Sequence, residues 1–366
     1  MSAPRLEIDL TKLQHNTGYL VEKLSTSGIS VTGVTKAFLA SPEIAKTLIE
    51  SGVSALGDSR IENIEKMRHA GIVASMTLIR SPMMSQVARV VRYADISFNT
   101  EIDIIRNLSN CASKAGVTHG IVLMVEMGDL REGIMLGDII ETVYDVLSLP
   151  NIKLCGIGTN LACRSGVSPD ERNMAELSDL ADAIDARFGI TLDTVSGGNS
   201  GNIEWALSGV NTGRINELRL GEALLLGREP LQRQAIDDLH TDAFTLVAEV
   251  IESKIKPSRP WGKLEQNAFG EQSSLSEDDF DIAQTILAIG LQDTDLTGLR
   301  APTGIEIIGG SSDHLIVNSG SRLPIGCEIR FQPNYSALVR AMTSPFVEKV
   351  VYSHDLNVEH GKPSDS

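Results

Sequence analysis

Lys36 is the first residue of this chain whose surroundings suggest chemistry. It follows the β-branched segment ISVTGVT (29–35), and its neighbours are Thr35 and Ala37 rather than charged residues. A lysine held at a strand end in apolar surroundings loses hydration, and its neutral amine can attack an aldehyde. For a single lysine, the more common interpretation is a side chain that extends its charge to solvent. A second feature must decide between the two.

The segment VSGGNSGN (195–202) supplies that feature. Its glycines and serines stand directly before a predicted helix, where backbone N–H groups and hydroxyl groups can face an anion. A lone glycine-rich loop is more often a tight turn. This loop, however, follows the seventh of eight predicted strands, where barrels often bind phosphate. The residues predicted to form the phosphate site are Ser196, Gly198, Asn199, Ser200 and, on the next strand, Gly221.

A reactive amine and a phosphate site together predict pyridoxal 5'-phosphate as cofactor, because that molecule carries both an aldehyde and a phosphate. Arg219 adds an unusual feature. Many pyridoxal enzymes place an acid beside the ring nitrogen, whereas the segment LRLG (218–221) offers a permanent cation. The alternative for Arg219 is a salt bridge at the barrel end with Glu217 or Glu222, and this strand alone does not decide between them.

The elements that would position these residues follow a regular alternation. Up to residue 230, eight short apolar segments alternate with breaks and amphipathic helical stretches, which predicts parallel strands. Eight such units in a segment of this length favour a (β/α)8 barrel over an open sheet. The predicted strands are 29–36, 53–58, 74–80, 94–99, 120–128, 153–160, 192–198 and 217–227.

After residue 230 the pattern changes to strands joined by turns. The segments 244–255, 282–290, 303–310, 314–320 and 326–333 are strand-like, with no clear helix between them. We therefore predict a barrel domain over 1–230 and a β domain over 231–352. We expect a polar loop at 257–279 and a polar, disordered tail at 353–366.

Composition limits the classes of function. The 366 residues include 48 acidic and 32 basic side chains, giving a net charge of -16 that disfavours nucleic acid as a partner. Neither a signal peptide nor an apolar segment long enough to cross a membrane is recognisable. The four cysteines show no CxxC spacing, so we expect a cytoplasmic protein without disulfide bonds and without a metal site.

Several segments resemble, in order, the alanine racemase-like (fold-type III) pyridoxal-phosphate enzymes, and in particular their ornithine racemase branch. They include LEIDLTKLQHN (6–16), VTKAFLASPEIAK (34–46), GTNLACRSGVSP (158–169), SGGNSGN (196–202), NELRLGEALLLG (216–227) and SSDHLIV (311–317). The resemblance implies a barrel followed by a β domain, and a homodimer in which the partner's β domain completes each active site.

The resemblance also implies roles for individual residues. Lys36 would form the Schiff base, and the phosphate would be bound by Ser200, Gly221 and the backbone of Glu222. The ring and substrate would contact Asn160, Arg219 and Arg131.

Two departures from the family pattern concern catalysis. Leu291, in LAIGLQDTD (287–295), stands where alanine racemases have a catalytic tyrosine, and Ala40 replaces a tyrosine that contacts phosphate. The second acid/base is therefore not identified. Asp293, Asp313 and His314 are candidates by position, with Asp313 assigned to the substrate, although aspartates in such turns commonly cap backbone N–H groups.

The predicted function is racemization of an amino acid with Lys36 as one of two acid/bases. Loss of bulky tyrosines should widen the pocket, and the branch resemblance also favours a basic amino acid such as ornithine or lysine. Two alternatives remain open. One is an aldolase of β-hydroxy amino acids, which would need a metal near Asp313 and His314. The other is a non-catalytic pyridoxal-phosphate carrier, which the presence of a β domain disfavours.

Overall fold

The structure is a computed structural model that describes residues 2–266, 270 and 280–354. The chain divides into two compact units, one formed by Lys12–Thr241 and the other by Met1–Thr11 together with Asp242–Ser366. The predicted domain boundary at residue 230 is therefore replaced by one after Thr241. The start of the chain also belongs to the β unit, because strand β1 (Arg5–Asp9) pairs with strands there.

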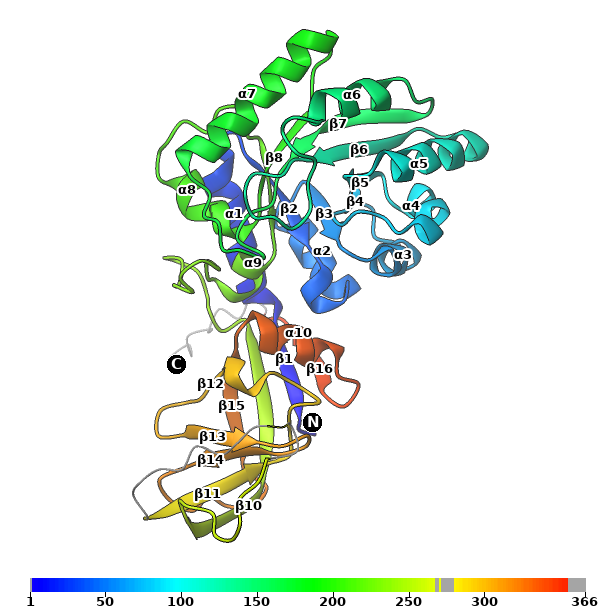
Figure 1. Cartoon of the computed structure of the whole chain (residues 1–366). Helices are drawn as coiled ribbons and strands as arrows, with labels where there is room; N and C mark the ends of the chain where they lie inside the picture. Colours follow the sequence, from blue (N-terminus) through cyan, green and yellow to red (C-terminus); the bar gives the residue numbers. More distant parts are fainter. Residues whose placement is uncertain (1, 267–269, 271–279, 355–366) are drawn as a thin grey trace, which may run out of the picture. The chain divides into compact units, whose positions relative to one another are not determined.

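Unit Lys12–Thr241 contains a closed barrel in which eight neighbouring strands are parallel, as predicted (Figure 1). The barrel closes where β2 pairs with β9, in a register that sets Thr32 beside Arg219. Its strands are β2 (Ser30–Val34), β3 (Ala55–Asp58), β4 (Met76–Leu78), β5 (Ile96–Asn99), β6 (His119–Met124), β7 (Ile152–Gly158), β8 (Thr194–Gly198) and β9 (Glu217–Leu220). Each falls within its predicted segment or begins one residue before it.

Helices surround the barrel strands (Figure 1). They are α1 (Leu10–Ser25), α2 (Pro42–Glu50), α3 (Ile61–His69), α4 (Val87–Tyr93), α5 (Ile102–Ala115), α6 (Ile139–Leu147), α7 (Glu171–Phe188), α8 (Ile203–Leu207) and α9 (Glu222–Leu226). The longest, α7, begins with a capping box between Asp170 and Asn173 and ends at Gly189 in the left-handed region. In the described part of the chain, no helix is long and apolar enough to cross a bilayer.

Tight approaches between strands explain glycine within the barrel wall. An added Cβ at Gly156 in β7 would lie 1.9 Å from the Thr194 carbonyl oxygen of β8. Any other residue at this position would push β7 away from the start of β8. The glycine at position 156 therefore lets the two strands lie close together.

The second unit is a mainly antiparallel sheet in the order β12-β15-β10-β11-β14-β13, with β1 and β16 attached through β10. Its elements are β10 (Phe244–Pro257), β11 (Asp281–Leu287), β12 (Leu299–Arg300), β13 (Glu306–Gly310), β14 (Leu315–Asn318), β15 (Glu328–Pro333), α10 (Tyr335–Thr343) and β16 (Glu348–Tyr352). The five predicted strands are present, whereas β12, α10 and β16 were not predicted. Residues 267–269 and 271–279 of the predicted loop, and 355–366 of the predicted tail, lie outside the described residues.

Candidate functional site

Lys36 leaves the barrel directly after β2, at the start of a short 3-10 turn, Lys36–Phe38. The two residues after it, Ala37 and Phe38, are buried and anchor the turn, while Lys36 itself is exposed. The expectation of apolar surroundings was therefore wrong, since only its sequence neighbours are buried. The positive charge of Lys36 opposes the burial that raises the pKa of Asp58 and of Glu222, so its amine lies near both carboxyl groups.

The backbone before Lys36 is fixed by a buried carboxylate on the neighbouring strand. The Thr35 hydroxyl donates to Oδ2 of Asp58 at 2.5 Å, and Asp58 is fully buried. The Asp58 carboxylate also accepts from the Arg60 N–H at 2.8 Å and from the Asn63 amide at 3.1 Å. Asp58 therefore ties the end of β2 to the start of the loop after β3, which defines where the Lys36 side chain begins.

The predicted phosphate loop is built by its own asparagines. Asn199 accepts from the Gly201 N–H at 2.8 Å, and its amide donates to Oδ1 of Asn160 at 3.1 Å and to the Leu161 carbonyl at 2.8 Å. Gly198 has φ +144°, and an added Cβ there would lie 2.2 Å from Oδ1 of Asn202. The Asn199 side chain thus joins the loops after β7 and β8. The absence of a side chain at Gly198 leaves room for the Asn202 side chain.

Ser200 connects this loop to the strand that follows. Its hydroxyl oxygen accepts from the N–H groups of Gly221 at 3.3 Å and Ala223 at 3.2 Å, and the residue is buried. With the oxygen occupied as an acceptor, the hydroxyl proton is available to donate. Beside it, Oε1 of Glu222 accepts from Arg233 at 2.9 Å. Burial raises the pKa of Glu222, and the charge of Arg233 opposes that change.

Arg219 is buried, and its guanidinium is held in the mouth of the barrel by neutral groups. It donates to the Ser196 hydroxyl and, at 2.6 Å, to the Thr159 carbonyl. Its guanidinium carbon lies 4.8 Å from the centre of the Phe98 ring. Among the described residues it forms no ion pair with Glu217 or Glu222, so the predicted salt-bridge alternative was wrong.

Burial and nearby charges both shift the pKa of this arginine, which is lowered overall. Burial lowers the pKa of Arg219, the negative charge of Glu217 raises it, and the positive charge of Arg131 lowers it further. Because its hydroxyl accepts from Arg219, Ser196 holds this arginine rather than facing an anion. A guanidinium held by neutral acceptors keeps its positive charge facing whatever the barrel mouth binds.

Two buried side-chain amide atoms near the mouth lack a hydrogen-bond partner in the described structure, although the other atom of each amide is paired. They are Nδ2 of Asn160, just after β7, and Oδ1 of Asn99, at the end of β5. A polar chain inside the barrel orients Asn99, because its amide donates to the Ser97 hydroxyl at 3.0 Å, which lies 2.9 Å from Nε2 of His119. Buried polar atoms are normally paired, so unpaired ones at a barrel mouth indicate a place for a ligand.

Arg131 lies on the loop after β6. It is exposed and pairs with its neighbour Glu132. Partial burial lowers the pKa of Arg131, but the hydrogen bond and charge of Glu132 outweigh this and raise the pKa above its ordinary value. Because this loop directly follows the carboxyl end of β6, it lies at the same end of the barrel as Arg219.

The remaining predicted residues lie in the β unit. Asp293 is buried and accepts from the Gly290 N–H at 3.3 Å and the Ser344 hydroxyl at 2.8 Å. Asp313 is exposed, and its carboxylate lies 3.4 Å from the Gln292 amide. His314 is partly buried, with Nδ1 3.2 Å from the Ser311 hydroxyl. The geometry of Asp293 favours a role as a turn cap.

Sequence interpretation thus found most of the polar groups at the carboxyl ends of the barrel strands but missed several supporting ones. Thr35, Glu132 and the unpaired Asn99 oxygen had no assigned role. Asp58 and Asn99 were visible as polar residues at strand ends, whereas the Thr35 contact depends on the register of β2 with β3.

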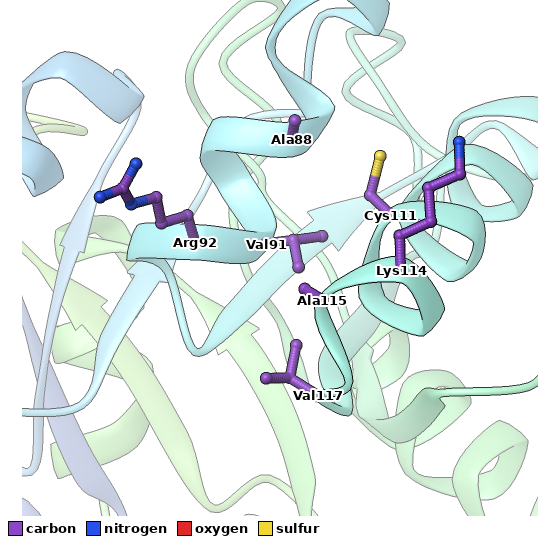
Figure 2. A pocket seen from close by; sticks show the side chains of 7 residues that line it. All are labelled: Ala88, Val91, Arg92, Cys111, Lys114, Ala115 and Val117. Carbon is purple, nitrogen blue, oxygen red and sulfur yellow. The ribbon is translucent and has the colours of Figure 1, made fainter.

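A pocket of about 500 Å³ lies elsewhere, between α4 and α5 (Figure 2). Small apolar side chains line it together with Arg92, Cys111 and Lys114. It contains no candidate site residue, and Arg92 and Lys114 extend away from its apolar floor in Figure 2. The candidate site is therefore the barrel mouth.

Comparison with known proteins gives consistent matches. The family described as "Alanine racemase, N-terminal domain" matches residues 8–229. The chain is 37% identical to an ornithine racemase of Acetoanaerobium sticklandii over 94% of this chain and 99% of that protein. It is 36% identical to a lysine racemase of Thermotoga maritima over 96% of this chain and 99% of that protein.

Solved structures show the same fold at lower identity. An alanine racemase from Streptomyces lavendulae has a TM-score of 0.74 and 16% identity, covering 96% of this chain and 98% of that one. A D-threonine aldolase from Filomicrobium marinum has a TM-score of 0.73 and 16% identity, covering 93% and 88%.

Proposed function

Because the chain belongs to the alanine racemase N-terminal domain family, we propose that it interconverts the L and D forms of a basic amino acid such as ornithine or lysine. The geometric observation that carries this proposal is an exposed amine, Lys36, on the same barrel end as the buried Arg219. The likeness to ornithine and lysine racemases along almost the whole chain supports the substrate class.

The residues at the barrel mouth fit pyridoxal 5'-phosphate as cofactor. Asn160 offers an unpaired N–H donor, and Ser200 offers a hydroxyl proton beside the N–H groups at the start of α9. We propose that Lys36 binds the aldehyde, Ser200 and the backbone of Gly221 and Glu222 bind the phosphate, and Asn160 and Arg219 contact the ring. When bound, the cofactor withdraws electrons from the α-carbon and makes its proton acidic.

The side chains of this chain then determine how the proton moves. Lys36 removes or returns the α-proton on one face of the substrate, and its fixed backbone limits it to that face. Arg219 would hold the ring nitrogen of the cofactor, and as a permanent cation it would disfavour protonation there. For the other face we propose His314 ahead of Asp293, whose carboxylate already caps a turn.

A histidine of the β unit would act most simply from a partner subunit, so we propose a homodimer with shared active sites. We also propose a cytoplasmic location, which the four free cysteines support. The aldolase alternative has less support, because the aldolase likeness, at 16% identity, shows the fold alone. The carrier alternative is disfavoured because the match to racemases extends over both units.

The test is to load the protein with pyridoxal 5'-phosphate and incubate it with single enantiomers of several amino acids in deuterated water. We expect formation of the opposite enantiomer with deuterium at the α-carbon, fastest for ornithine or lysine. Borohydride reduction and peptide mapping should place the cofactor on Lys36. A label on Lys46 or Lys66, or the absence of enantiomer conversion with every amino acid, would show that the proposal is wrong.

A further inference from the structure

The loop between β6 and Ile134 carries three acidic residues, and two of them hold the loop in shape. Glu126 accepts from the N–H groups of Gly128 at 2.6 Å and Leu130 at 3.0 Å. Asp129 is almost fully buried and accepts from the N–H groups of Arg164 and Ser165, both at 2.9 Å, which ties this loop to the one after β7.

The third acid, Glu132, has a different environment. Its carboxylate accepts hydrogen bonds from Arg131, with Nη2 to Oε1 at 2.5 Å. The side chains of Arg131 and Glu132 are 36% and 27% exposed. Ion pairs this accessible to water stabilise a protein little, so a ligand with matching charges can replace them without a large loss of folding free energy.

Glu132 lies at the same end of the barrel as Arg219. Its loop leaves the carboxyl end of β6, while Arg219 lies in the barrel mouth against Ser196 and Phe98. Hydrogen bonds from Arg164 to the Asp129 carboxylate and to the Leu130 carbonyl hold this loop beside the loop after β7. Glu132 is therefore a carboxylate at the mouth that is not needed to build the loop.

Other acids near the mouth are less suited to bind a cation. Asp58 is fully buried and accepts from Thr35, Arg60 and Asn63. Glu222 pairs with Arg233 beside the proposed phosphate position, where a substrate cation would compete with the cofactor. The partner of Glu222, Arg233, is also exposed, but of these acids Glu132 alone is paired with the arginine predicted to contact the substrate, Arg131.

We propose that Glu132 selects substrates with a basic side chain, by binding their terminal ammonium group while Arg131 binds their α-carboxylate. This inference rests on the proposed function and names the residue that determines its substrate class. In the free protein the charges of Arg131 and Glu132 neutralise each other. A bound substrate replaces this ion pair with two others, one between its α-carboxylate and Arg131 and one between its ammonium group and Glu132. A basic amino acid offers both charges, whereas a neutral one leaves Glu132 without a partner once Arg131 has turned to the carboxylate.

The test compares lysine with norleucine, which has the same six-carbon chain but lacks the terminal ammonium group. In Glu132→Gln the side chain keeps its shape, and its amide oxygen can still accept from Arg131. We expect the ratio of kcat/KM for L-lysine to that for L-norleucine to fall roughly 10- to 100-fold, mainly through KM for lysine, because a charge-assisted hydrogen bond is lost. Glu132→Lys should lower the ratio further, since like charges repel.

Asp138→Asn is the matched control. Asp138 is exposed beyond this loop, directly before α6, and its side chain makes no capping hydrogen bond to that helix. Asp138→Asn changes the net charge by the same amount as Glu132→Gln. Because Asp138 has no proposed contact with the substrate, the lysine-to-norleucine ratio of this variant should stay within about twofold of the wild type. Cofactor content and melting temperature show whether each variant is folded.

The outcomes separate this inference from the proposed function. If the wild type racemizes lysine and the ratio is unchanged in Glu132→Gln, or if Asp138→Asn or Glu222→Gln lowers it equally, then Glu132 does not select the substrate. If the wild type acts on no amino acid, the proposed function and this inference both fail.

Discussion

His119 allows a quantitative prediction about the interior of the barrel. It is the first residue of β6 and only 2% exposed, and its Nε2 lies 2.9 Å from the Ser97 hydroxyl. Burial lowers the pKa of His119 to about 4, although the charge of Asp95 opposes that change. The folded barrel therefore holds a neutral imidazole under conditions in which an unfolded chain begins to bind a proton.

The sign and size of the effect follow from proton linkage. An unfolded histidine has a pKa of about 6.5, so between that value and about 4 the unfolded state binds the extra proton. The barrel should therefore lose stability as pH falls through this range and keep this contribution above it. Each pH unit corresponds to about 1.4 kcal/mol, so His119 alone should remove about 3 kcal/mol by pH 4.

The measurement compares urea unfolding of the wild type and His119→Gln from about pH 7.5 to about pH 4, because the difference between the two cancels the other titrating groups. Near pH 7.5 the variant should be less stable, since it loses the Ser97 contact. On acidification its disadvantage should shrink and then reverse. His69→Gln, which removes an exposed imidazole, is the control. Parallel pH profiles for wild type and His119→Gln would refute the assignment of a buried neutral histidine.

Further predictions concern the barrel mouth and the β unit. Ser200→Ala should weaken cofactor binding roughly 10- to 150-fold in a dialysis titration, because a hydroxyl donor to a charged oxygen is lost; unchanged affinity would return the loop to a structural role. Thr35→Val should lower stability by about 1–3 kcal/mol, since the buried Asp58 carboxylate loses a donor, and reduce borohydride labelling of the lysine. Thr35→Ser should restore both. His314→Ala should slow racemization in both directions, whereas Asp293→Asn should mainly lower the melting temperature; full activity in His314→Ala would place the second acid/base elsewhere.

The barrel could be predicted from the sequence because its signal is local. Each strand is a short apolar segment bounded by polar loops, and the sites lie at strand ends, where the order of the strands alone brings Lys36, Ser200 and Arg219 to one face. The exposure of Lys36 was not predictable in this way. Its neighbours Ala37 and Phe38 are buried on a 3-10 turn, which points the lysine away from the surface that buries them.

Contacts between distant segments could not be predicted, because a single sequence does not show which segments become neighbours. Arg219 donates to Ser196 in β8 and to Thr159 just after β7, while Glu217, two residues away in the sequence, was the obvious candidate. The N-terminal segment that forms β1 was likewise included in the predicted barrel domain, 1–230. Which sheet it joins depends on pairing with residues near the other end of the chain, and a single sequence contains no direct signal of that pairing.

The arrangement of β1 also determines the order in which the two units can be completed during synthesis. All residues of the barrel unit lie in one continuous segment, Lys12–Thr241, so the barrel has its full set of strands once Thr241 has left the ribosome. The β unit must wait, because β1 pairs Arg5 with Glu348 of β16. Closing so long a loop is slow unless the intervening chain is already compact. A folded barrel is such a compact spacer, so substitutions that delay barrel folding should leave β1 and the edge of β10 exposed to pairing with other chains.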